Sequence, residues 1–125
     1  MKNQKLYVLA LKNRSGKSIS KIGETRQDLE KRIVGFGFSG KWRKRESEVE
    51  IILELDTLLA PTIERIVKDT LQKNWKENQL KDKNLGRGYT EWYFMKPTSM
   101  VGIVIRAFRT LYDTDKYLSI KLKGE

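Results

Sequence analysis

Glu64 is a charged residue on the apolar side of an expected helix. A helix that begins near Pro61 carries an apolar stripe made of Ile63, Ile66, Val67, Leu71 and Trp75. At about 100° per residue, the Glu64 side chain projects between Leu71 and Trp75, inside or at the rim of this stripe. A carboxylate there is costly unless a cation or a metal ion neutralises it. An internal salt bridge and a metal site are therefore the two interpretations of Glu64.

Arg32 lies in a similarly ambiguous position. In an expected helix whose apolar face includes Leu29 and Ile33, it sits beside that face and not opposite to it. Its aliphatic stem can pack on the core while its guanidinium reaches water. The functional interpretation is a permanent planar cation directed at phosphate, a group that the arginine fork binds well.

Two absent residue types restrict the chemistry further. The 125-residue chain contains no histidine and no cysteine, which excludes a Ser-His-Asp triad, an imidazole base, disulfides and His- or Cys-based zinc sites. Catalysis would have to use tyrosine, lysine, arginine and carboxylates. Any metal ion would be hard and bound by oxygen, such as Mg²⁺ or Mn²⁺.

The net charge of +10 is concentrated in the first part of the chain. Residues 1–46 hold 13 Lys and Arg against 4 Asp and Glu, whereas residues 47–125 hold 13 against 12. This asymmetry favours a polyanionic partner, with nucleic acid foremost. A generally basic soluble surface is the alternative, and the basic amphipathic helix expected of a membrane-surface protein is missing.

A basic cluster with one aromatic residue ends this part of the chain. It consists of Lys41, Trp42, Arg43, Lys44 and Arg45. We expect its cations to contact DNA phosphates and Trp42 to stack on a base or sugar. A solvated basic loop is the alternative.

The periodicity predicts the elements that must position these residues. Strands are expected at residues 6–12, 18–23, 49–55 and 89–96, with an edge strand at 117–122. Helices are expected from a capping box over residues 25–28 to the glycines at 35, 37 and 40, from Pro61 to about Trp75, and over 100–112. This order predicts one α+β domain over residues 1–125, with a small, mostly antiparallel sheet flanked by helices. No apolar run approaches the roughly 20 residues of a membrane span, and the N-terminus lacks a signal-peptide pattern, so we expect a cytoplasmic protein.

Four separated pieces of sequence, taken in order, resemble the GIY-YIG nuclease superfamily. They are LYV at residues 6–8, KIG at 21–23, LEKRI at 29–33 and the later Glu64. KIG, LEKR and the GYTEWY of residues 88–93 are similar to a branch found in phage and mobile-element proteins. That branch has lysine in place of the second tyrosine and a glutamate-tryptophan-aromatic strand near its end. The resemblance covers residues 6–96 and leaves 97–125 as a C-terminal extension.

The resemblance implies a metal-dependent DNA endonuclease or nicking enzyme. Tyr7 would orient or deprotonate the attacking water, Arg32 would neutralise the scissile phosphate, and Glu64 would hold one Mg²⁺ or Mn²⁺. Lys21 replaces the second tyrosine. It would act either as a base with a lowered pKa or as a phosphate contact.

By the same resemblance, Gly23 and Glu91 would support this site, and a charge on an edge strand is the alternative for Glu91. By the two-residue period of a strand, Glu91 shares a face with Tyr89 and Tyr93, whereas Trp92 and Phe94 face the core.

Two other functions need no catalysis. The first is a nucleic-acid-binding regulator or anti-host factor of a phage or mobile element on the same fold. The second is a basic protein that binds an acidic protein partner. If the chain is a nuclease that cuts both strands, we expect a homodimer or two sequential nicks, because one short domain has one site.

Overall fold

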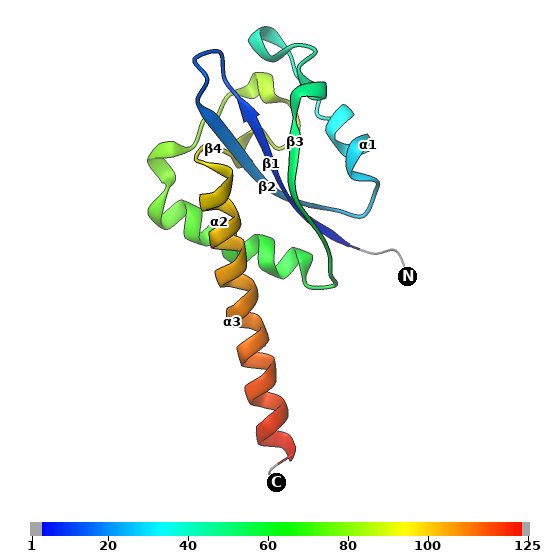
Figure 1. The fold of residues 1–125 in the computed structure, drawn as a ribbon, viewed down its shortest axis with the longest axis vertical. Helices are drawn as coiled ribbons and strands as arrows, with labels where there is room; N and C mark the ends of the chain where they lie inside the picture. The colour runs from blue at the N-terminus through cyan, green and yellow to red at the C-terminus, as the bar shows by residue number, and fades with distance from the viewer. Residues whose placement is uncertain (1–3, 124–125) are drawn as a thin grey trace.

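A four-stranded antiparallel sheet forms the centre of the computed structural model, which describes residues 4–123 and the side chains of residues 4–111 (Figure 1). The strands are β1 (Lys5–Lys12), β2 (Ser18–Thr25), β3 (Glu50–Asp56) and β4 (Trp92–Phe94), in the spatial order β3-β1-β2-β4. β1 and β2 form a hairpin in which Tyr7 lies opposite Gly23. The predicted α+β class and antiparallel sheet are confirmed.

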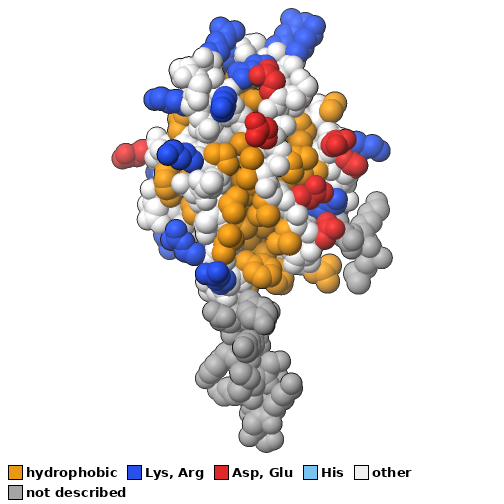
Figure 2. Space-filling view, in the orientation of Figure 1, with side chains coloured by type: hydrophobic (Ala, Val, Ile, Leu, Met, Phe, Trp, Pro, Cys, Tyr) orange, Lys and Arg blue, Asp and Glu red, His pale blue; other side chains and the backbone are white. Residues whose placement is uncertain are grey.

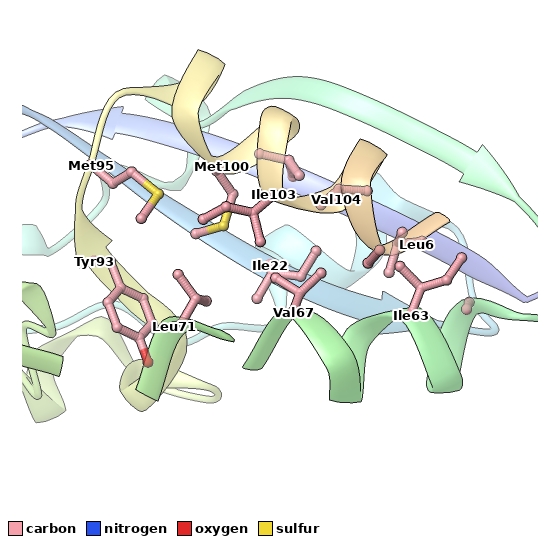
Figure 3. Packing of buried hydrophobic residues seen from close by; sticks show 13 residues of the cluster. Leu6, Ile22, Ile63, Val67, Leu71, Tyr93, Met95, Met100, Ile103 and Val104 are labelled. Atoms are coloured by element: carbon pink, nitrogen blue, oxygen red, sulfur yellow. The ribbon is translucent and has the colours of Figure 1, made fainter. Parts of the chain in front are cut away.

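Three helices cover the two faces of the sheet. They are α1 (Leu29–Val34), α2 (Ala60–Asn74) and α3 (Pro97–Lys123). Because alternate strand residues point to opposite faces, Leu6 and Val8 pack with α2 and α3 (Figure 3), whereas Tyr7 and Leu9 pack with α1. The sheet therefore separates two apolar clusters, and Tyr7 belongs to the α1 side.

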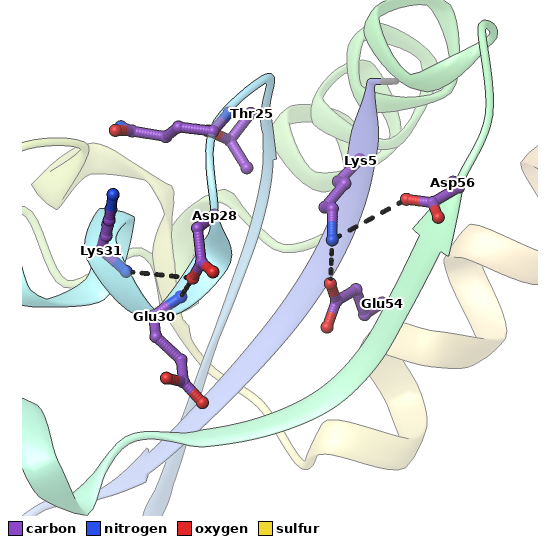
Figure 4. A network of polar contacts seen from close by, with 8 residues as sticks. Lys5, Thr25, Asp28, Glu30, Lys31, Glu54 and Asp56 are labelled. Carbon is purple, nitrogen blue, oxygen red and sulfur yellow. Dashed lines mark hydrogen bonds and ion pairs between the residues drawn. The ribbon is translucent and has the colours of Figure 1, made fainter. Parts of the chain in front are cut away.

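The first helix begins later than the sequence predicts. Asp28 caps it by accepting hydrogen bonds from the backbone of Glu30 and Lys31 (Figure 4). Thr25, the expected cap, is still part of β2, and its hydroxyl accepts only from Gln27. An aspartate directly before the helix can reach these amides, so the capping box over 25–28 is wrong.

The N-terminal end of β1 is joined to β3 by charge. Lys5 Nζ lies 2.6 Å from Glu54 Oε1 and 4.0 Å from Asp56 Oδ1 (Figure 4). β3 is an edge strand, and charged side chains on an edge strand discourage pairing with a second sheet.

β4 is much shorter than the predicted strand over 89–96. Residues 89–91 form a 3₁₀ turn, which follows Gly86 and Gly88 with φ of 68° and 74°. Tyr93 is buried and Phe94 is 42% exposed, so the assignment of Phe94 to the core is wrong. Within β2, β4 pairs with Ile19, Ser20 and Lys21, and its Tyr93 also forms an isolated bridge with Gln79. The rest of β2 has no strand beside it on that edge within the described residues.

The last helix is longer than predicted. α3 continues through residues 117–122, where an edge strand was expected, and extends beyond the rest of the chain (Figure 1). A helix already formed adds a hydrogen bond with each further residue, whereas a six-residue alternation is a weak strand signal. No helix in the described part of the chain is long and apolar enough to cross a membrane.

Candidate active site

Tyr7 is fully buried against the backbone of Gly23. A side chain at Gly23 would collide with the Tyr7 hydroxyl, so a glycine is required opposite this tyrosine. Burial raises the pKa of Tyr7 to about 12, and a hydrogen bond and the positive charge of Arg32 act in the opposite direction. The hydroxyl is therefore protonated near neutral pH and is held next to a guanidinium.

Arg32 is held by aromatic contact and still has donors to spare. Its guanidinium carbon lies 5.8 Å from the centre of the Phe36 ring. Its Nε is buried and has no hydrogen-bond partner within the described residues. The side chain does not simply reach into water, and its Nε donor is left without a protein partner among the described residues.

Lys21 is an ion-paired core residue. Its side chain is 0% exposed, and its Nζ lies 2.9 Å from Glu91 Oε1. The ammonium is also 5.5 Å from the Phe36 ring centre and 5.8 Å from that of Tyr7. Burial lowers the pKa of Lys21, although the carboxylate of Glu91 opposes this shift.

Gly88 makes room for this ion pair. It has a φ of 74°, and a Cβ at this position would lie 2.6 Å from both Lys21 Nζ and Glu91 Oε1. Glu91 itself follows in the 3₁₀ turn before β4. The turn thus places a carboxylate at the end of β4, where β2 loses its neighbour.

Lys68 of α2 connects Glu91 to Glu64. Its Nζ lies 2.8 Å from Glu91 Oε2 and 3.1 Å from Glu64 Oε1. Burial raises the pKa of Glu64, and Lys68 partly offsets that effect. Burial would also raise the pKa of Glu91, but the charges of Lys21 and Lys68 hold it below its usual range. Glu64 thus forms an ion pair with Lys68, and its role as a metal ligand stays a prediction.

Glu24 is a third carboxylate of this region, and the sequence did not bring it to attention. Its Oε2 is buried without a hydrogen-bond partner among the described residues, and its charge contributes to the raised pKa of Glu64. Lys68 had a readable signal, because it follows Glu64 by four residues on one helix. Glu24 had none, since the alternation of a strand does not reveal where its edge is uncovered.

The carboxylates of Glu64 and Glu91 are ligands of the type that a hard divalent cation takes. Both approach one ammonium, so their oxygens converge on one point of positive charge. Mg²⁺ commonly binds through one or two carboxylates and keeps several waters. Within the described residues, no group of three Asp, Glu, His or Cys side chains could hold a metal ion. A two-carboxylate site is therefore the limit of what these residues offer.

A small hollow opens beside this cluster. It has a volume of about 230 Å³ and is lined by Lys68 and Glu91 together with Gln72, Gln79 and Thr90. A larger groove of about 670 Å³, lined in part by Trp75 and Phe94, shares no residue with the cluster.

Trp42 is not available for stacking, because it is 2% exposed. Its indole Nε1 donates to Asp82 Oδ2 at 2.9 Å, and the cations of Lys41 and Arg45 lie 5.6 and 5.1 Å from its ring centre. The expectation that it stacks on a base or sugar is wrong, since Trp42 fills the core on the α1 side of the sheet. A basic cluster in a sequence does not indicate which of its members is buried.

The cations of the basic cluster divide into two pairs. Arg45 bonds Glu48 and the carbonyl of Lys12, and Lys41 lies 3.6 Å from Asp82. The other two, Arg43 and Lys44, are exposed and make no ion pair or side-chain hydrogen bond with the described residues.

Comparisons with protein-family models, curated proteins and solved structures find no match to this chain. The resemblance to the GIY-YIG superfamily therefore stays a prediction from the motifs.

Proposed function

We propose that this chain is a divalent-metal-dependent DNA endonuclease or nicking enzyme of the GIY-YIG type, which acts in the cytoplasm. The observation that supports it is the convergence of groups from separate elements. Tyr7 of β1, Lys21 of β2, Arg32 of α1, Glu64 of α2 and Glu91 before β4 are linked by contacts or by electrostatic interaction. Titratable groups with shifted pKa values tend to cluster at functional sites.

Arg32 and Tyr7 would bind the scissile phosphate and the attacking water. The guanidinium of Arg32, whose Nε has no partner among the described residues, would donate to a phosphate oxygen, and its fixed charge would stabilise the negative charge that develops there. With a pKa of about 12, Tyr7 would orient the water and would not remove its proton.

Glu64 and Glu91 would hold the Mg²⁺ or Mn²⁺ ion, which supplies Lewis-acid stabilisation of the phosphate. Lys21 would hold the Glu91 carboxylate in place, because its ammonium is fully buried on Glu91 Oε1. We propose this role for Lys21 in place of the two that the sequence left open, namely a catalytic base and a phosphate contact.

The basic end of the molecule would bind the DNA backbone. Figure 2 shows Lys and Arg side chains around the end where Figure 1 places the β1–β2 loop and the segment between α1 and β3. A hollow of about 240 Å³ there is lined by Arg14, Lys41 and Arg45. Phosphate contacts of this kind bind DNA without sequence preference.

The direct test is incubation of the protein with supercoiled plasmid and Mg²⁺, Mn²⁺ or a chelator. We expect relaxed circles with either ion and none with the chelator. Linear product would indicate two copies or two successive nicks. If the plasmid stays intact at every ion concentration although the protein binds it, the proposed nuclease activity is contradicted.

The second candidate is a nucleic-acid-binding protein without catalysis, and one observation favours it. Both carboxylates that could hold a metal ion are already neutralised by lysines. This candidate predicts salt-dependent DNA binding without cleavage. If the protein does not bind DNA either, the remaining candidate is a basic protein that binds an acidic protein partner.

A further inference from the structure

We infer that the ammonium of Lys68 occupies the divalent cation's position between Glu64 and Glu91, so that the ion binds only when Lys68 moves away. The inference rests on the proposed metal site and identifies a residue of this chain that controls its occupancy. The observations that support it are the distances and exposures of the ion pairs.

The carboxylate oxygens that face one another are already occupied. Lys68 Nζ lies 3.1 Å from Glu64 Oε1 and 2.8 Å from Glu91 Oε2, while the other oxygen of Glu91 binds Lys21. A divalent ion bound by the same two oxygens would lie within a few ångströms of the ammonium. Two cations that close repel strongly in a partly buried site, so they cannot share the position.

Only one of the two lysines can leave. Lys21 is 0% exposed and lies close to the rings of Tyr7 and Phe36. Lys68 is 41% exposed, lies on the surface of α2 and lines the hollow of about 230 Å³. Its flexible four-carbon stem can carry the ammonium into solvent without a change in the backbone. Lys21 is therefore a fixed part of the site, and Lys68 is exchangeable.

The exchange has a consequence for substrate binding. An ammonium displaced by the metal ion loses its two anionic partners, and a DNA phosphate at the site would offer it a new one. Metal and DNA should therefore strengthen each other's binding. The protein alone should hold the ion weakly and should fold without it, because Lys68 already neutralises the carboxylates.

The test is a titration of the DNA-free protein with Mn²⁺, in which electron paramagnetic resonance measures the free ion. We compare wild type with Lys68→Met, which keeps the length of the side chain and removes its charge. We expect Lys68→Met to bind Mn²⁺ about tenfold or more tightly than wild type, since one close repulsion disappears. The double variant Lys68→Met/Glu64→Gln should lose this gain.

The matched control is Lys73→Met. Lys73 is an exposed lysine of the same helix, with no ion pair in the described part of the chain. The Lys73→Met substitution removes the same unit of positive charge. A gain in Mn²⁺ affinity that both variants share therefore comes from the net charge of the protein and not from the position of Lys68. Equal Mn²⁺ affinities of Lys68→Met and Lys73→Met would overturn the inference.

Melting temperatures with and without Mn²⁺ cover the case in which Lys68→Met folds poorly without the ion. Lys68→Gln provides a second, polar variant. If Mn²⁺ raises the melting temperature of either Lys68 variant more than that of Lys73→Met, the inference is supported. Equal increases in melting temperature in all three variants overturn it. Because no step measures DNA cleavage, a protein that never cuts DNA can still pass this test, and an active nuclease can fail it.

Discussion

Lys21 and Lys68 bind opposite oxygens of one carboxylate, yet their burial gives them different roles. Glu91 is held from inside by a lysine without solvent contact and from outside by a lysine that is partly in water. An exposed pair contributes little to stability, whereas loss of one partner of a buried pair leaves a charge without compensation. The two lysines should therefore respond differently to the same substitution.

Lys21→Met should lower the free energy of unfolding by about 1–3 kcal/mol, because a buried oxygen of Glu91 loses its partner while Lys68 still neutralises the charge. Urea denaturation followed by circular dichroism measures the loss. Lys73→Met again serves as the control and should change little. A Lys21→Met protein as stable as wild type would show that the buried pair does not stabilise the fold.

Glu64→Gln should abolish plasmid cleavage, because the metal ion loses a charged ligand. The DNA affinity should stay equal or increase slightly, since one repulsion with phosphate disappears. Stability should fall by no more than about 1 kcal/mol, because Lys68 is partly exposed and keeps Glu91 as partner. The assay pairs plasmid cleavage with a thermal melt. A variant that melts much earlier yet still cuts DNA would contradict the catalytic role of Glu64.

Asp82 should make the stability of the protein depend on pH in the acid range. Burial would raise its pKa, but hydrogen bonds from Trp42 and the Asn84 backbone, with the charge of Lys41, hold it below the ordinary 3.8. A carboxylate with a lowered pKa in the folded state stabilises the protein above its ordinary pKa. That contribution is lost as the pH falls through the folded value. Urea denaturation of wild type and Asp82→Asn should show a difference in unfolding free energy that is constant above about pH 5 and shrinks below 3.8. A difference independent of pH would contradict this assignment.

At the scale of elements, the sequence predicts regular structure well and its interruptions poorly. The β1–β2 hairpin and α2 follow from apolar periods that the core then confirms. The start of α1 and the length of β4 depend on local backbone geometry, namely the Asp28 cap and two glycines with positive φ. Several residue types can cap a helix, and glycine is permitted in many backbone conformations, so the sequence alone does not reveal these interruptions.

The same limit applies to the candidate site. Glu64 and Arg32 were noticeable because each charge conflicts with an apolar helix face. Glu91 came from the motif. The pairing of Lys68 with Glu64 was readable from their spacing, but its contact with Glu91 and the position of Glu24 become visible only when α2 is placed beside the uncovered edge of β2. Contacts between elements far apart in the chain do not follow from periodicity.

Gly88→Ala should disturb the site through the turn that precedes β4. Its φ of 74° strains any side chain, and the added methyl would also meet Lys21 Nζ and Glu91 Oε1 at 2.6 Å. We expect a loss of about 2–4 kcal/mol in unfolding free energy, which is the sum of the backbone strain and the cost of displacing the ion pair. Gly16→Ala is the control, because Gly16 has a φ of 81° and open space around its Cβ position. Equal losses in both variants would show that the turn does not support the Lys21–Glu91 pair.

At the scale of the whole molecule, the cations of residues 41–45 have two different roles. Part of their positive charge stabilises the fold, because Arg45 and Lys41 bind the cluster around Trp42 and Asp82. Arg43 and Lys44 have no such partners among the described residues, and they belong to the segment between α1 and β3, at the same end of the molecule as the β1–β2 loop (Figure 1). The free cations are those expected to bind DNA.

Arg43→Ala/Lys44→Ala should therefore change DNA binding without changing stability. Each phosphate contact releases counterions, so the slope of log affinity against log salt concentration should become shallower by about 2 for the two lost contacts. Fluorescence anisotropy with a labelled duplex at several salt concentrations measures this slope. Lys73→Ala/Lys76→Ala removes the same charge from α2 and the residues after it, and should leave the slope almost unchanged. Arg45→Ala should instead lower the melting temperature, because it breaks the bonds to Glu48 and to the carbonyl of Lys12. If the Arg43/Lys44 variant keeps the wild-type slope, DNA binds elsewhere on the molecule, and the basic cluster serves the fold alone.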